Sequence, residues 1–199
     1  EVWSDFQKSP SVLTRSLWAT TTKALIGYGI AALGAILAAA VAALVASLRN
    51  PIYNFGVALH SIPLIATTPL LAVWLGTTPR THIIIAALAC YFPMLVGAMQ
   101  GFRAAERTRL ELFHVFSASP LQRFRYLLFP SALPYLFAGF KIAAPSAVLG
   151  TLTAEWAGAE MGIGVLMLHS LFAFDVPKVW LAVITACAMS AAGYGVWAL

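Results

Sequence analysis

Long apolar segments separated by short polar ones run along most of the chain. A helix needs about 20 apolar residues, at about 1.5 Å each, to cross a bilayer. Five segments have that length: residues 24–47, 54–76, 82–102, 134–154 and 178–199. Residues 1–22 mix aromatic and charged side chains, as is typical of the membrane–water interface, so we interpret them as an interfacial lead-in. The pattern predicts an all-α, polytopic membrane protein whose single transmembrane domain occupies residues 23–199.

The composition agrees with this fold class. Of the 199 residues, 61% are hydrophobic and 10% are charged, whereas a soluble domain has about 25% charged residues. The net charge of +5 would suggest a nucleic-acid partner in a soluble protein, but here the basic residues cluster in loops, as membrane topology requires. We therefore expect membrane lipid, and no nucleic acid, as a partner.

Prolines at positions 63 and 69 interrupt the second apolar segment. A proline removes a backbone donor, and such breaks are tolerated at membrane depth where the freed groups meet protein or water. Polar side chains lie beside these prolines, and the fourth segment carries a stripe of small residues that allows close helix packing. A translocation path is one interpretation, and a kink used only for packing is the other. The candidate path residues are His60, Pro63, Thr67, Ala143 and Ala147.

The longest polar interruption, residues 103–131, carries its own helix signals. Its five arginines indicate a cytoplasmic loop. Ser119 followed by Pro120 and Gln122 predicts a capped helix start, because serine caps the free N–H groups and glutamine three residues later closes a capping box. We expect a short helix, a tight turn just before Ser119, and a second short helix that ends at Pro130. The pattern also fits an ordinary basic, amphipathic loop on a membrane surface.

Part of this loop resembles the EAA loop of type I ABC importer permeases. That loop has Glu-Ala-Ala, a glycine six residues after the glutamate, and an aliphatic-x-Leu-Pro ending. The matching positions here begin at Glu111 and end with Leu127-Leu-Phe-Pro, where Phe129 stands at the position of the family's leucine. Leu112 and Phe113 occupy the alanine positions, and Ser117 occupies the glycine position.

The resemblance extends beyond the loop and is to the nitrate, sulfonate, taurine and pyrimidine branch of these permeases. It covers the chain from about Leu17 onward. The segments that carry it are Ile62-Pro63, Trp74-Leu75-Gly76, Phe92-Pro93, Ala118-Ser119, Gln122-Arg123-Phe124, Leu133-Pro134, Ala154-Glu155-Trp156 and Gly162-Ile163-Gly164. Permeases of this branch usually have six spans, so the resemblance implies that the first one is missing from the N-terminus.

The resemblance implies a permease subunit of a bacterial inner-membrane importer for a small anionic or heterocyclic solute. Its expected partners are a second permease copy, two ABC ATPase subunits, and a periplasmic or lipid-anchored solute-binding protein. ATP and magnesium would bind the ATPase subunits, and this chain would bind no cofactor. The residues expected to contact the ATPase are Glu111, Leu112, Phe113, Phe116, Ser117, Ala118, Ser119, Pro120, Gln122 and Arg123.

The chain lacks the motifs of an enzyme. It has no GxxxxGK[ST] phosphate loop, no HExxH zinc motif and no Gly-x-Ser-x-Gly nucleophile elbow. The alternative function is a gradient-driven secondary transporter or a channel. Ion coupling usually requires acids or paired charges inside the membrane, and the pattern places only Lys141 within a span, which counts against this alternative.

Overall fold

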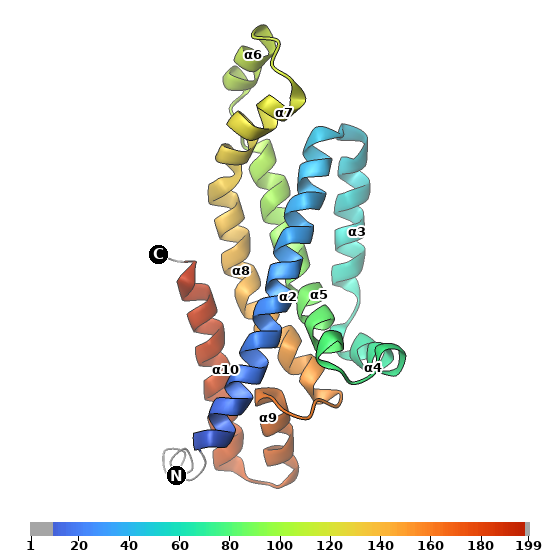
Figure 1. Cartoon of the computed structure of the whole chain (residues 1–199), viewed down its shortest axis with the longest axis vertical. Helices are drawn as coiled ribbons and strands as arrows, with labels where there is room; N and C mark the ends of the chain where they lie inside the picture. Colours follow the sequence, from blue (N-terminus) through green and yellow to red (C-terminus); the bar gives the residue numbers. More distant parts are fainter. Residues whose placement is uncertain (1–9, 198–199) are drawn as a thin grey trace.

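The computed structural model describes residues 10–197, and within that range it contains helices and no β-strand (Figure 1). Three long helices, α2 (Pro10–Leu44), α5 (Pro79–Arg103) and α8 (Phe129–Trp156), form the centre of the bundle. Helix α10 (Val176–Val196) lies along α8. The helices in chain order are α2 (Pro10–Leu44), α3 (Arg49–Ser61), α4 (Leu64–Leu75), α5 (Pro79–Arg103), α6 (Arg107–Val115), α7 (Pro120–Arg123), α8 (Phe129–Trp156), α9 (Ile163–Phe172) and α10 (Val176–Val196). Two short segments, the 3-10 helix η1 (Ala46–Leu48) and the π-helix η2 (Phe124–Leu128), join neighbouring helices.

Helices α5 and α8 approach so closely that their backbones touch. A Cβ atom at Gly97 would lie 2.8 Å from the Tyr135 carbonyl oxygen and 2.9 Å from the Gly139 Cα atom. One turn further along α5, a Cβ at Gly101 would lie 2.9 Å from the backbone of Ala132. Lipid provides no hydrophobic drive for helix association, so small residues that let backbones meet stabilise such a pair through van der Waals contact.

Helix α2 packs on α5 through a stripe of alanines. Ala31, Ala35, Ala39 and Ala42 are buried, at successive spacings of three or four residues. The opposite face exposes large aliphatic side chains such as Leu33 and Leu37. Since apolar side chains are stable in lipid and small ones favour close packing, this distribution is the one expected for a membrane helix.

The predicted boundary between a lead-in and the first span does not coincide with any break in the structure. Helix α2 is continuous from Pro10 to Leu44, so residues 10–22 share one helix with the first predicted span. Residues 1–9, the rest of the predicted lead-in, lie outside the described residues. The described part of the chain has four helices that are long and apolar enough to cross a membrane, or up to five if the bent α3–α4 pair counts as one span.

The second predicted span, residues 54–76, is sharply broken at Pro63, one of the two prolines that the sequence indicated as interruptions. Helices α3 and α4 meet at an angle of 89°, at Ile62 and Pro63. Ile62 is extended, with φ −75° and ψ 122°, because the proline ring disfavours helical geometry in the residue before it. Pro69, by contrast, lies inside α4 without ending it.

The prediction that Pro130 ends the second loop helix was wrong. The chain passes from α7 through η2 into α8 as one helical segment, Pro120–Trp156. In η2 the Phe129 N–H donates to the Phe124 carbonyl, five residues back instead of four. In an α-helix the ring of Pro130 would clash with the carbonyl of residue 126. The wider π turn before it displaces that carbonyl, and the proline is accommodated in the first turn of α8.

Candidate functional site

Helices α6 and α7 protrude from one end of the bundle as a helical hairpin, which we call the α6–α7 hairpin (residues 107–123) (Figure 1). The turn between them depends on Ser117, whose φ of 51° lies in the left-handed region. With that turn made, the Ala118 N–H donates to the Phe113 carbonyl at 3.0 Å and closes the end of α6. The turn predicted from sequence is thus confirmed. Ser117 adopts the left-handed conformation that glycine adopts most easily.

The capping box predicted at the start of α7 is present. The Ser119 hydroxyl accepts from the Gln122 backbone N–H at 3.3 Å, and the Gln122 side-chain oxygen accepts from the Ser119 N–H at 2.8 Å. Pro120 occupies the first helical position, where it needs no backbone donor. These bonds fix how α7 leaves the turn, so the hairpin is an ordered structure and not only a polar connection.

The end of α6 exposes large apolar side chains. Leu112, Val115 and Phe116 are 55%, 81% and 74% exposed, and Glu111 is also exposed beside them. Val115 was not among the residues predicted from sequence. Phe113, which was, lies half-buried against the chain's own core. The exposed patch formed by Leu112, Val115 and Phe116 is hereafter called the α6 apolar patch.

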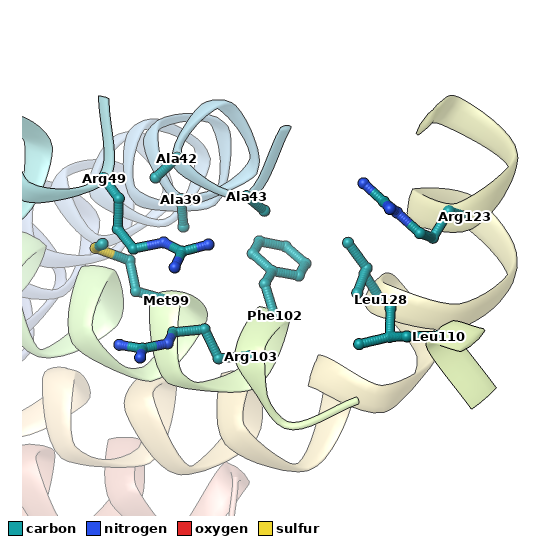
Figure 2. A pocket seen from close by; sticks show the side chains of 10 residues that line it. All are labelled: Ala39, Ala42, Ala43, Arg49, Met99, Phe102, Arg103, Leu110, Arg123 and Leu128. Atoms are coloured by element: carbon teal, nitrogen blue, oxygen red, sulfur yellow. The ribbon is translucent and has the colours of Figure 1, made fainter. Parts of the chain in front are cut away.

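Two further residues of the loop differ in their surroundings. In an uninterrupted α-helix Leu121 would share one face with Leu127 and Leu128, but its side chain is 69% exposed while the other two are buried. Leu127 and Leu128 lie within the widened η2 turn, which shifts the helical phase after Leu121 and accounts for the difference. Arg123 is half-buried, and it lines a cavity instead of facing outward (Figure 2).

We expect Ser117→Gly to stabilise the turn by about 0.5–1 kcal/mol, because a left-handed backbone costs an ordinary residue about 1–2 kcal/mol. Ser117→Val should destabilise it by a similar amount, since a β-branched side chain tolerates positive φ poorly. Hydrogen exchange at the Ala118 amide, which closes the turn, measures the effect directly. Slower exchange in the glycine variant and faster exchange in the valine variant are the expected results, and the reverse order would contradict the argument.

The candidate path residues do not form one cluster. His60, Pro63 and Thr67 lie at the α3–α4 break, where the His60 ring stacks on an aromatic ring of α5 with the centroids 4.8 Å apart. Ala143 and Ala147 lie on α8 and are buried in the core of the chain. A role for these residues in translocation therefore remains a prediction, with the α3–α4 break as its structural basis.

A buried ionic network, absent from the sequence predictions, lies at the opposite end of α8. Glu155 is one residue beyond the predicted span 134–154, but it lies in the last turn of α8 with its side chain fully buried. Its carboxylate accepts from the Thr20 hydroxyl at 2.9 Å, the Lys23 ammonium at 3.0 Å and the Gly164 N–H at 2.9 Å. The sequence interpretation that only Lys141 is charged within a span is therefore incomplete, because α2 and α8 carry this pair.

The same network holds the loop between α8 and α9. The Lys23 ammonium also donates to the Met161 carbonyl at 2.9 Å, and the Thr20 hydroxyl accepts from the Ile163 N–H at 2.8 Å. A Cβ atom at Gly162 would overlap the Glu155 carboxyl group. The sequence signal that could have indicated this network is the position of Glu155, an acid at the end of an apolar segment and shortly before the Gly162-Ile163-Gly164 motif.

The sequence model of the family described as binding-protein-dependent transport system inner membrane component matches residues 30–196. The chain belongs to this family. The resemblance inferred from the loop and its flanking motifs is thereby confirmed, and so is the localisation of a multi-pass protein in the inner membrane.

Individual relatives of this family are moderately similar. The formylaminopyrimidine transport permease ThiX of Halalkalibacterium halodurans is 33% identical over 132 residues, which cover 66% of this chain and 53% of that protein. The riboflavin transport system permease RibX of Chloroflexus aurantiacus is 29% identical over 126 residues, covering 63% and 46%. The putative aliphatic sulfonates permease SsuC of Bacillus subtilis is 27% identical over 126 residues, with the same coverage. The chain spans about half the length of the curated relatives it matches.

A solved structure supports the fold. The inward-facing MetNI methionine ABC transporter contains a chain that superposes with a TM-score of 0.71, at 19% identity, over 94% of both chains. The predicted all-α, type I ABC importer permease fold is confirmed by this match.

Proposed function

We propose that this chain is the membrane-spanning permease subunit of an ATP-driven importer and that the α6–α7 hairpin docks on an ABC ATPase subunit. The observation that carries the proposal is the α6 apolar patch, which lies on an ordered hairpin that protrudes from the bundle (Figure 1). Apolar side chains exposed together on a rigid element are typical of a protein interface. Membership of a family of transport components supports the same assignment.

The hairpin has the mechanical connection that such a role requires. It continues through η2 into α8, so a displacement of α7 by the ATPase moves the longest helical segment of the bundle. A ligand shifts a conformational equilibrium only through different contacts in its states, and ATP-driven closure of two ATPase subunits would change the contacts at this hairpin. ATP and magnesium would act on those subunits, and a pair of these permease chains would enclose the path.

The names of the relatives support a class of solute for this chain. Permeases named for formylaminopyrimidine, riboflavin and aliphatic sulfonates are similar to this chain, which supports a small heterocyclic or anionic solute. A separate binding protein would deliver it. Binding of candidate solutes to the purified cognate binding protein, followed by uptake in cells, distinguishes these classes.

The decisive experiment is Glu111→Arg, for which we expect loss of transport and of ATPase association. A solvated charge tolerates reversal, because surface ion pairs contribute only about 0–1 kcal/mol. A charge buried at a subunit contact does not, and a well-packed interface residue weakens association by about tenfold or more when altered. Co-purification of the ATPase and solute uptake are the measurements, with membrane insertion and dimerisation expected to be normal.

Two further variants complete the design. Phe116→Ala removes an exposed ring that contributes little to the fold of this chain, so it should also weaken ATPase association while the permease remains stable. Glu160→Arg makes the same charge reversal at an exposed position near the opposite end of the bundle and should have no effect on association. Wild-type transport and ATPase retention in Glu111→Arg would contradict docking and would favour the alternative, an ordinary amphipathic loop on the membrane surface.

A further inference from the structure

Three arginines from three different elements line one cavity of about 320 Å³ (Figure 2). Arg49 begins α3, Arg103 ends α5 and Arg123 ends α7. In Figure 2 the Arg49 and Arg103 side chains lie on one side of the Phe102 ring, and the Arg123 side chain lies on the other. The sequence places these three residues far apart, so their convergence is a property of the fold.

The charge of this cavity is not neutralised within the described chain. No acidic side chain lines it, and none of the three guanidinium groups forms a hydrogen bond or an ion pair with another described residue. Arg49 and Arg123 are nevertheless half-buried. Because partly buried cations repel one another, an anion between them would be stabilised. A planar guanidinium donates two parallel hydrogen bonds to a phosphate group, which makes phosphate the anion that best fits arginines.

The rest of the lining is apolar, and this decides the source of the phosphate. The alanine stripe of α2 ends here with Ala39 and Ala42, and Met99, Phe102 and Leu128 contribute further apolar surface. Helices α2 and α5 are long and apolar enough to cross a membrane, and the cavity lies where both end (Figure 1), so we expect it near the change from hydrocarbon to headgroups. A free anion would gain nothing from the apolar wall, whereas a phospholipid would place its phosphate at the arginines and its glycerol and first methylenes against that wall.

We propose that this cavity binds the phosphate group of an anionic phospholipid, between Arg49 and Arg103 on one side and Arg123 on the other. Basic pockets between membrane helices recognise anionic headgroups in this way. The lipid would connect α3 and α5 to α7, which is one helix of the hairpin, and would thereby stabilise their relative positions. The binding itself requires neither ATP nor an ATPase subunit, so its test is independent of the proposed function.

The test is a lipid titration of the full-length protein in detergent, followed by native mass spectrometry. We expect phosphatidylglycerol to bind in preference to phosphatidylethanolamine. An arginine beside an anionic headgroup strengthens its binding about fivefold, so Arg49→Gln and Arg103→Gln, which remove cavity-lining arginines, should each weaken phosphatidylglycerol binding by about that factor and the double variant by about 25-fold. Phosphatidylethanolamine has the same phosphate but no net charge, so its binding should weaken less than that of phosphatidylglycerol in each variant, and an unchanged melting temperature shows that the variants are folded.

Arg125→Gln is the matched control, since Arg125 is exposed, lies two residues from Arg123 and does not line the cavity. It removes the same charge and should leave phosphatidylglycerol binding unchanged. An equal loss in Arg125→Gln, or no loss in the double variant, would overturn the assignment. A second arm adds millimolar inorganic phosphate in place of lipid. If inorganic phosphate binds and phosphatidylglycerol does not displace it, the cavity is a site for a soluble anion. That result would also overturn the lipid assignment.

Discussion

Glu155→Ala should destabilise the protein by about 3–5 kcal/mol, the range measured when one partner of a buried ion pair is removed. The carboxylate is the acceptor for Thr20, Lys23 and the Gly164 N–H, so its loss leaves three donors without their acceptor at once. The Lys23 side chain is only 11% exposed and cannot fully regain water in place. The measurement is the free energy of unfolding of the full-length protein in detergent, obtained by denaturant titration.

A second substitution separates the charge effect from the loss of contacts. In the double variant Lys23→Met and Glu155→Ala, no buried charge remains unpaired, so we expect recovery of at least about 1 kcal/mol relative to Glu155→Ala alone. Glu160→Ala, at an exposed acid five residues later, should change stability by less than about 0.5 kcal/mol. Equal stabilities of Glu155→Ala and Glu160→Ala would contradict the role of the network.

Gly97→Val is expected to separate α5 from α8 and to destabilise the protein by about 3 kcal/mol or more, at the upper end of what overpacking costs. The reason is that the added carbon collides with backbone atoms at Tyr135 and Gly139, which cannot rotate away as a side chain can. The expected observations are a lower melting temperature in detergent and a reduced yield of folded protein, both compared with the wild type.

Gly29→Val is the matched control for this substitution. Gly29 lies on α2 with no atom within 4 Å of the position a Cβ would take, so the same added side chain meets open space. We expect its stability to equal or slightly exceed that of the wild type, because valine is a better helix former than glycine. Similar losses in the two variants would attribute the effect to helix propensity and not to the α5–α8 contact.

The sequence predicted the α6–α7 hairpin well because its determinants are local. The capping box joins Ser119 to Gln122 three residues later, and the turn at Ser117 is closed by a bond within five residues. Glu155, in contrast, bonds to groups more than 130 residues away, at Thr20 and Lys23, and no spacing rule connects them. The three arginines of the cavity were likewise assigned to loops, because only the fold shows that they share a space.

The rule that a proline ends a helix failed at Pro130, because the turn before this proline is not α-helical. Pro130 ends an ordinary helix, and the prediction followed that rule, but the π turn before it removes the clash on which the rule depends. Pro63 obeyed the rule, since no such turn precedes it and Ile62 adopted an extended conformation. A helix can therefore end at a proline or continue through it, and the geometry of the preceding turn determines which of the two occurs.

The π turn of η2 also sets the direction in which the hairpin faces. A five-residue hydrogen-bonded turn contains one residue more than the α-helical turn that it replaces, and each residue of an α-helix advances by about 100° around the axis. Relative to an uninterrupted α-helix leading into α8, the residues before η2 are therefore rotated by about one residue's advance. The azimuth of the α6 apolar patch about the α8 axis thus depends on the length of the chain between Arg123 and Phe129, whatever side chains it carries. A single-residue deletion there would preserve every apolar side chain of the patch and still aim it in another direction.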